Sequence, residues 1–364
     1  MPRRRPPARV AALLIALGLL AAACATEAKG APATPADDTA VATAPTTAAP
    51  TTTAAPTTTL PATTTTTTEP PPIVFPLTGL PADNALLTLR PAVVAKVGNY
   101  DAHPTTGVNA ADIVFEELIN DHISRFALVY QSTFPEDPVG PIRSGRIQDV
   151  NLLSSLNAPI LAWAGGNGTV TREIDDSELI NLNQTHCAGS CFRVSFEKAP
   201  YNLYFDIQAA YDVGSQQGAG SPGPQFQFRA DGDPVAGTPS AGVDLSIDAY
   251  DMGWTWNPDT GLYERTQNGK VHDERNGEQI TTDNVVILAM VYAPGISNSP
   301  DAQSVGSGEV WVFSGGRMVH GTWSRTDRLH PFTLTADDGS PILLTPGRTF
   351  VELPRAGKDA ITPK

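Results

Sequence analysis

Hydrophobic and polar positions divide the 364-residue chain into three regions. An apolar run covers residues 10–23 and follows a start that contains four arginines. Residues 25–72 are mostly Thr, Ala and Pro and offer little to bury. From residue 73 onward, short apolar segments alternate with polar turns, which is typical of a folded domain. We therefore expect a leader, a tether and a folded body of about 280 residues.

The first half of the body mixes strand and helix patterns. Strands are expected at 92–97, 113–118, 126–130 and 159–163, with the second and third joined as a hairpin. Apolar residues at three-residue steps predict a helix over 144–156, with Ser144 as its N-cap. A second helix is expected over 204–211. This mixture predicts an N-terminal mixed α/β domain over residues 73–213.

The second half of the body contains only strand-like segments. They lie at 243–247, 254–256, 262–265, 285–291, 310–313, 318–323, 342–344 and 350–353, separated by Gly, Asn and Asp turns. An uncharged Gly- and Pro-rich stretch before them predicts a linker over 214–225. We therefore expect an α+β protein, in which the first domain is followed by a smaller, antiparallel β-rich domain over 226–355.

The leader has the features of a lipoprotein signal peptide over residues 1–23. Its apolar run is too short to cross a hydrocarbon core of roughly 30 Å. Small residues precede Cys24, and a thiol at that place adds nothing to ordinary signal cleavage but resembles the bacterial lipobox. We expect Cys24 to carry lipid and to hold the protein on the outer side of the cell membrane. A plain signal peptide with an incidental cysteine is the alternative.

The segment 24–72 is expected to be a disordered tether. Thr, Ala and Pro bury too little apolar surface to offset the entropy of ordering, and six consecutive threonines occupy 63–68. As a flexible coil the segment would reach roughly 40 Å. That reach would lift the body off the membrane and toward wall polymer.

Charge and motif content exclude several classes of function. Without residues 1–23 the chain keeps 20 basic against 38 acidic side chains. Nucleic acid is not expected as a partner, because its phosphates need a basic surface. The sequence contains no P-loop, nucleophile elbow or HExxH, and no dinucleotide fingerprint between a predicted strand and a predicted helix, so no cofactor is expected.

Cys187 and Cys191 remain once Cys24 is assigned to lipid. In an oxidising compartment this pair is expected to form a disulfide across a small Gly-containing loop. Two alternatives stay open, namely two free thiols or a metal site that adds His186. The metal site is not favoured, since the segment offers no fourth ligand.

Two polar segments could bind a ligand. Asn99, Asp101 and His103 follow the first strand of the body, where side chains project from a fixed element end. The alternative is a turn in which Asn and Asp bond their own backbone. Lys198 and Asn202 have aromatic neighbours and could meet a sugar or a peptide, although a helix lead-in with core tyrosines explains them equally well.

The hairpin after the first strand carries Glu116, Glu117 and Arg125. Adjacent strand residues point to opposite faces of a sheet, so the two glutamates cannot both line one site. A paired-carboxylate hydrolase built from them alone is therefore not expected. We keep Glu116 and Arg125 as candidate ligand contacts.

The segment around residue 143 is the strongest candidate for a binding site. It places Arg143, Ser144 and Arg146 at the expected start of a helix, whose N-terminal end is already positive. Two arginines there are unfavourable unless an anion lies between them, and guanidinium groups suit carboxylates and phosphates. That anion is either an internal carboxylate, Glu116 or Glu117, or an external ligand.

An ordered set of motifs resembles the YerB-like bacterial lipoproteins. The matching segments are PLTGLP (76–81), RP (90–91), Asn99, GVNAADIVFE (107–116), RF (125–126), GPIRS (140–144), AGG (164–166), KAPYNLY (198–204), NGKVH (268–272), NVV (284–286) and PGRT (346–349). The chain departs from the family pattern in the Cys187/Cys191 loop and at Gly98, where an acidic residue is usual. The resemblance implies a lipid anchor and an N-terminal mixed α/β domain joined to a smaller β-rich one. It implies no activity.

We interpret the chain as a cell-envelope lipoprotein that binds a wall component such as peptidoglycan, or another exported protein, without catalysis. The alternative is a wall-acting hydrolase or transferase with Glu116 or Asp101 as acid or base, since scattered carboxylates can cleave glycans. A solute-binding component of a transporter is least favoured, because the second half lacks alternating helices and strands.

Overall fold

A computed structural model describes residues 72–364, except 121, 122 and 249. The predictions for the signal peptide, for Cys24 and for the tether up to residue 71 lie outside the described residues. Within the described part of the chain, no helix is long and apolar enough to cross a membrane.

Helices are few and short. They are α1 (Ala85–Thr88), α2 (Ile147–Leu153), α3 (Gly168–Asp175) and α4 (Ile207–Gly214), with 3-10 turns η1 (Val108–Ala110), η3 (Ser154–Leu156), η4 (Ser215–Gln217) and η5 (Ile296–Asn298). The predicted N-cap at Ser144 is wrong, because α2 begins only at Ile147. Arg146 is the N-cap residue, and the Asp149 carboxylate accepts its backbone N–H at 2.6 Å, which closes the first turn there.

The second predicted helix also begins later than expected. Residues 203–205 form a strand, and α4 follows Asp206, whose carboxylate accepts the N–H of Ala209 at 2.9 Å. An aspartate at an N-cap satisfies a backbone donor that the helix leaves unpaired. The cap at Asp206 therefore decides where the strand ends and the helix begins.

The larger sheet has eleven strands within the described residues. In spatial order they are β19 (Thr333–Ala336), β18 (Arg317–Arg325), β17 (Gly306–Ser314), β14 (Asn284–Leu288), β20 (Thr349–Glu352), β2 (Ile113–Ile119), β3 (Ile123–Tyr130), β1 (Val93–Gly98), β4 (Ile160–Trp163) and β5 (Ile180–Asn183), with β8 (Thr238–Pro239) paired to β18. The predicted hairpin is present as β2 and β3. The strand predicted at 342–344 is absent from this sheet, and Leu344 forms only an isolated bridge to Phe228.

The other strands form one further sheet and two short ribbons. The sheet runs β12 (Lys270–Val271), β11 (Leu262–Gln267), β10 (Tyr250–Asn257), β9 (Gly242–Ile247) and β21 (Ala360–Pro363), with β13 (Thr281–Thr282) paired to β11. The ribbons are β15 (Tyr292–Pro294) with β16 (Pro300–Ala302), and β6 (Cys191–Arg193) with β7 (Leu203–Phe205). The α+β class is confirmed, since strands dominate and helices are few.

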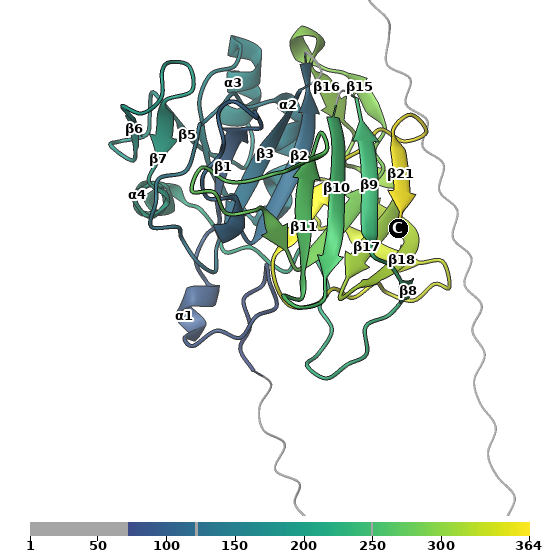
Figure 1. Ribbon diagram of the computed structural model, residues 1–364. Coiled ribbons are helices and arrows are strands. Elements are labelled where there is room, and N and C mark those ends of the chain that lie inside the picture. The colour runs from purple at the N-terminus through teal and green to yellow at the C-terminus, as the bar shows by residue number, and fades with distance from the viewer. Residues whose placement is uncertain (1–71, 121–122, 249) are drawn as a thin grey trace, which may run out of the picture. The chain divides into compact units, whose positions relative to one another are not determined.

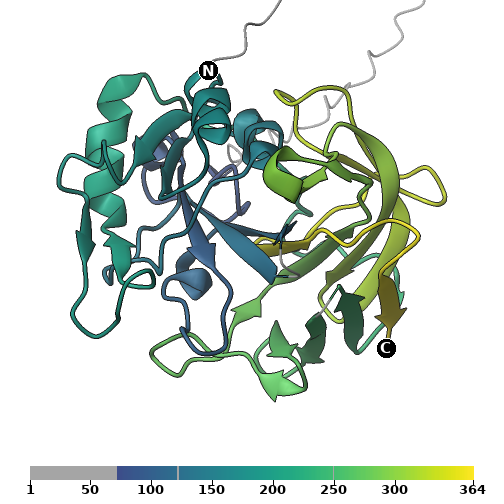
Figure 2. The same cartoon turned by 90° about the horizontal axis from the view of Figure 1, so that it is seen from above.

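The larger sheet is covered on both faces. One face packs against the smaller sheet and α4 through a core that includes Val97, Phe126 and Trp254. The opposite face packs against α2 and α3 through a core that includes Phe115 and Val150. Figure 1 shows β9, β10 and β11 in front of the larger sheet, and Figure 2 shows the α-helices, in blue to teal, gathered on one side of the molecule.

The two halves of the sequence share the larger sheet. β20 lies between β14 and β2 and pairs in parallel with both, so one sheet runs from the second half into the first. The segment 214–225 packs on the first half, because Gln225 is buried and accepts a hydrogen bond from Ser155 at 2.7 Å. All described residues belong to one compact unit. The domain boundaries at 213 and 226 stay a prediction.

Candidate functional site

The residues predicted from the sequence lie on two opposite faces of the larger sheet. Side chains alternate along a strand, and the two cores show which face each strand residue takes. Asn99 and Glu116 share the face covered by the smaller sheet. Arg125 points to the α2 face and donates to the backbone oxygen of Ser144 at 2.9 Å. The candidates therefore do not meet in one cleft.

Glu116 belongs to a buried network that ties the two sheets together. Its Oε2 accepts from Arg265 of β11 at 2.6 Å, and its Oε1 accepts from Asn99 at 3.0 Å and from Ser124. The same Arg265 donates to Glu352 of β20 at 2.5 Å. Burial raises the pKa of Glu116 to about 8, the positive charge of Arg265 opposes that rise, and the charge of Glu352 adds to it.

Beside this network lies a cavity of about 240 Å³. Asp101, Gln267 and His272 contribute to its wall, and Gln267 Nε2 donates to Asp101 Oδ1 at 2.9 Å. His272 Nδ1 accepts from Arg265 Nε at 3.0 Å. Burial and the charge of Arg265 lower the pKa of His272 to about 3, so this ring is neutral at physiological pH. Asp101 itself is exposed.

Glu117 is engaged on the opposite face. It contacts the ammonium group of Lys96, which also lies 2.7 Å from Asp149 Oδ1, and all three side chains are fully buried. Burial, followed by the charge of Asp149, raises the pKa of Glu117 to about 8. The sequence analysis missed Lys96, although a lysine inside the apolar run of β1 was a usable signal.

Three arginines, Arg125, Arg143 and Arg146, form what we call the arginine cluster. Burial and the charges of the other two lower the pKa of Arg125 to about 10, and burial lowers the pKa of Arg146. Among the described residues, none of the three forms an ion pair with a carboxylate. The internal glutamates named as possible partners are engaged elsewhere, Glu116 with Arg265 and Glu117 with Lys96.

The side chains of Arg143 and Arg146 donate to neutral groups, while the charges of Asp149 and Glu117 act on Arg146 and oppose the lowering of its pKa. Arg146 donates to Asn120 Oδ1 at 2.8 Å and to Ser299 Oγ at 3.1 Å. Arg143 donates to the backbone oxygen of Pro200 at 3.1 Å, and its guanidinium carbon lies 5.5 Å and 5.1 Å from the ring centres of Tyr100 and Tyr201. The Nε atoms of Arg125 and Arg143 have no hydrogen-bond partner among the described residues.

Gly98 makes room for this arrangement. A Cβ atom there would lie 2.3 Å from the Tyr100 ring and 3.1 Å from Arg143 Cγ. A glycine at the end of β1 therefore lets the aromatic ring and the arginine stem approach the strand.

His103, Lys198 and Asn202 lie near the rim of the cluster. The His103 ring stacks on Tyr201 with centres 3.7 Å apart, and its Nδ1 lies 3.1 Å from Glu197 Oε2. Lys198 is exposed in the turn that leads to Tyr201. Asn202 Oδ1 accepts from Arg193 at 2.6 Å. Tyr100 and Tyr201 were not predicted as site residues.

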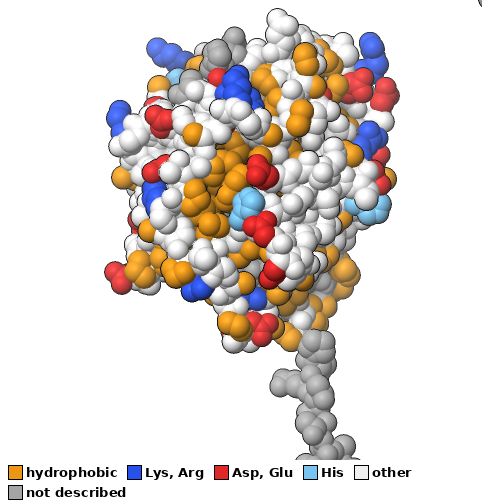
Figure 3. All heavy atoms as spheres, turned by 90° about the vertical axis from the view of Figure 1, so that its right-hand side faces the viewer, with side chains coloured by type: hydrophobic (Ala, Val, Ile, Leu, Met, Phe, Trp, Pro, Cys, Tyr) orange, Lys and Arg blue, Asp and Glu red, His pale blue; other side chains and the backbone are white. Residues whose placement is uncertain are grey.

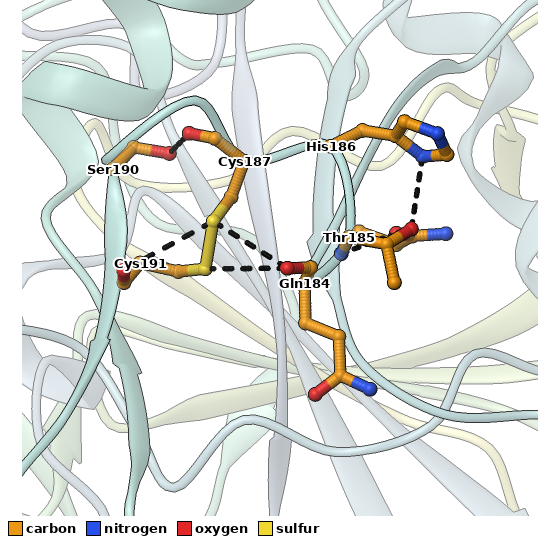
Figure 4. The surroundings of a disulfide bond; sticks show 7 residues. Gln184, Thr185, His186, Cys187, Ser190 and Cys191 are labelled. Atoms are coloured by element: carbon orange, nitrogen blue, oxygen red, sulfur yellow. Dashed lines mark hydrogen bonds between the residues drawn. A yellow bond between two sulfur atoms is a disulfide. The ribbon is translucent and has the colours of Figure 1, made fainter.

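The cysteine loop is separate from the cluster. The sulfur atoms of Cys187 and Cys191 are joined, with the Cα atoms 5.7 Å apart. Figure 4 shows that His186 turns away from the sulfur atoms toward Thr185. Such a short loop pins its own segment, and its effect on the unfolded chain is small.

Figure 3 shows one face of the molecule, with Lys and Arg side chains scattered singly toward its edges. This face of the described chain presents no broad basic surface.

Comparison with known proteins gives a consistent relationship. Residues 77–220 match the N-terminal domain, and residues 242–351 the C-terminal domain, of the family described as "Protein of unknown function (DUF3048)". A relative named "Putative lipoprotein YerB", from Bacillus subtilis (strain 168), is 25% identical over 287 residues, which cover 76% of this chain and 85% of the relative. The crystal structure of YerB protein from Bacillus subtilis has the same fold, with a TM-score of 0.69 at 22% identity, over 79% of this chain and 99% of that one.

Proposed function

Since the chain belongs to the DUF3048 family, whose two domains it contains in order, we propose that it is an extracytoplasmic lipoprotein that binds an anionic component of the cell wall without catalysis. The relative's name as a lipoprotein supports the anchor, as does the leader that ends before Cys24. A lipid on Cys24 and the segment 24–72 would place the body within reach of the wall.

The arginine cluster is the observation that carries this proposal. Guanidinium groups that repel one another, and that form no ion pair with a carboxylate of the described residues, favour an external anion. Arg143 and Arg146 are half-buried, so their guanidinium groups are restrained while remaining partly accessible. Their side-chain hydrogen-bond partners among the described residues are neutral oxygens, and the charges of Asp149 and Glu117 act on Arg146 without forming an ion pair with it.

The aromatic rings beside Arg143 indicate what else the ligand contains. Tyr100 and Tyr201 present partly exposed rings next to the guanidinium, and exposed Lys198 adds a further positive charge nearby. A face that combines aromatic rings with cations suits a sugar polymer that bears phosphate or carboxylate groups. An acidic segment of another exported protein is the competing ligand.

A wall-acting hydrolase or transferase is less favoured by the geometry. Both carboxylate oxygens of Glu116 are occupied, and the side chain is only 3% exposed. Asp101 is exposed beside the cavity of about 240 Å³, but its Oδ1 already accepts from Gln267. Among the described residues, neither stands in a pair of accessible carboxylates, which is the usual arrangement for glycan cleavage.

The proposal is tested by cosedimentation of the full-length lipoprotein, in detergent, with insoluble peptidoglycan. One sample keeps its covalently attached phosphate polymers, and the other has been stripped of them. We expect Arg143→Met to bind the first sample about tenfold more weakly than wild type, which corresponds to about 1.4 kcal/mol. Arg172→Met is the matched control, because it removes the same charge from an exposed position on α3.

Equal binding by wild type and Arg143→Met would remove the arginine cluster as the site. Equal binding of wild type to both samples would identify the peptide carboxylates of peptidoglycan, rather than the phosphate polymers, as the bound anion. If wild type sediments with neither sample, the ligand is not a wall component, and an acidic segment of another exported protein becomes the favoured ligand.

A further inference from the structure

Lys96, Glu117 and Asp149 form a triad that is closed to solvent. Each of the three side chains is 0% exposed. Lys96 Nζ contacts Glu117 Oε1 and lies 2.7 Å from Asp149 Oδ1, although 53 residues separate Lys96 from Asp149 in the chain. The triad therefore brings an amine against two carboxyl groups inside the protein.

Strand register and helix capping place the three groups. Lys96 of β1 and Glu117 of β2 lie on strands separated by β3, and the residue of β3 opposite Lys96 is Ala127. This small residue lets the lysine stem reach across the sheet. Asp149 comes from the first turn of α2, above the same face.

The orientation of both carboxyl groups is fixed by further donors. The backbone N–H of Arg146 donates to Asp149 Oδ2 at 2.6 Å. Gln148 Nε2 donates to Glu117 Oε2 at 2.7 Å. Consequently Asp149 Oδ1 and Glu117 Oε1 both turn toward Lys96 Nζ.

This environment favours uncharged forms. The three side chains carry one positive and two negative charges without water, which is costly to bury, and the charge of Arg146 acts on both carboxylates. Burial raises the pKa of Glu117 to about 8, so this group holds a proton at neutral pH. If the proton comes from Lys96, an amine and a carboxylic acid result, both neutral.

We propose that Lys96 and Asp149 become joined by an intramolecular isopeptide bond. Nζ of the neutral amine attacks Cγ of Asp149, and the Arg146 N–H stabilises the charge that develops on Oδ2. The Nζ–Cγ bond forms and the Cγ–Oδ1 bond breaks. The Lys96 ammonium loses two protons, and Glu117 accepts each of them in turn and passes it to Oδ1. Oδ1 leaves as water, and Glu117 returns to its starting state. The reaction uses no oxidant, reductant or cofactor.

Asp149 is assigned as the acyl partner because a backbone donor holds its second oxygen, as an oxyanion requires. Glu117 is assigned as the acid and base because its side chain contacts the amine and is protonated by its surroundings. The bond would tie the central strand β1 to helix α2. This inference is independent of the proposed wall binding.

Peptide mass spectrometry of the full-length protein, denatured and digested with trypsin, tests the bond. Unlinked protein gives cleavage after Lys96 and releases residues 97–125 and 147–172 as separate peptides. Linked protein resists cleavage after Lys96, so residues 30–125 stay together and are joined to 147–172 in one species, which is about 18 Da lighter than the sum of these two peptides because one water is lost. We expect the linked species in wild type and none in Lys96→Met.

Glu117→Gln keeps the shape of the side chain but cannot shuttle protons. We expect its linked fraction, measured early after synthesis, to form about 100-fold more slowly than in wild type. Wild-type protein cleaved fully after Lys96 would overturn the proposal. A link from Lys96 to Glu117, seen as an internal loop within one peptide, would overturn the assignment of Asp149. Equally fast linkage in Glu117→Gln would overturn the role of Glu117.

Discussion

Glu116 and Glu117 are neighbours on β2, yet their carboxylates serve networks on opposite faces of the sheet. Glu116 pairs with Arg265 of the smaller sheet, and Glu117 with Lys96 beneath α2. These two adjacent residues therefore link the larger sheet to the smaller sheet on one face and to α2 on the other. Both carboxyl groups form their ion pairs with these structural partners, and neither forms one with the arginine cluster, although the charge of Glu117 acts on Arg146.

Removal of Arg265 tests the first network. Arg265→Met would leave Glu116 and Glu352 buried without their shared cation, and we expect the free energy of unfolding to fall by about 3 to 5 kcal/mol. Urea unfolding followed by fluorescence measures this change. Arg328→Met is the control, because its partner Glu178 is at the surface and its loss costs about 0 to 1 kcal/mol. Equal losses in both variants would contradict the structural role of the network.

The same carboxyl group predicts a pH dependence of stability. The pKa of Glu116 is about 8 in the folded protein and near its ordinary value of 4.5 in the unfolded chain. The folded state therefore binds more protons between these limits, and the free energy of unfolding should fall as pH rises from about 5 to 8. Glu117 acts in the same direction, so Glu116→Gln should reduce this slope without abolishing it.

Urea midpoints at pH 5, 6, 7 and 8 give that slope. Glu136→Gln, at an exposed position, serves as the control and should keep the wild-type slope. A Glu116→Gln protein with an unchanged slope would show that this group titrates alike in both states.

Much of the fold could be predicted because it depends on local patterns. Alternation along β2 was enough to place the two glutamates on opposite faces, and the hairpin with β3 followed from its polar turn. The first residues of the helices were harder to predict. The start of α2 depends on Asp149 accepting the Arg146 N–H, and a search for Ser or Thr caps does not find it.

The partners in the networks could not be predicted, because they come from distant parts of the chain. Glu116 and Arg265 are 149 residues apart, and no spacing rule connects them. The position of β20 between β2 and β14, parallel to both, could not be predicted for the same reason. It depends on how the two halves of the sequence pair in one sheet. The dipole argument applies only to Arg146, which caps α2, because Arg143 precedes the helix start and Arg125 lies on β3.

Membrane attachment through Cys24 is a prediction that lies outside the described residues. Cys24→Ala should leave the membrane fraction or retain its signal peptide, because lipid transfer needs the thiol. Fractionation followed by immunoblotting measures this shift. Cys187→Ala is the matched control and should stay with the membrane, since its sulfur pairs with Cys191 in the folded body. Full membrane retention of a processed Cys24→Ala protein would contradict the lipid anchor.

Replacement of Arg125 distinguishes a ligand-binding role of its side chain from a structural role. Its side chain is 4% exposed, has no carboxylate partner among the described residues, and is repelled by Arg143 and Arg146. Arg125→Met keeps the apolar stem and removes this charge, at the loss of one hydrogen bond to Ser144. We expect the free energy of unfolding to stay constant or to rise by up to about 2 kcal/mol.

The same variant should bind phosphate-bearing peptidoglycan more weakly, because one of three positive charges is gone. Stability that holds while binding falls is the pattern of a site that is kept for its ligand at some cost to the fold. Urea unfolding and cosedimentation on one preparation give both quantities. A loss of more than about 2 kcal/mol, comparable to that of a broken buried pair, would instead place Arg125 among the structural charges with Arg265.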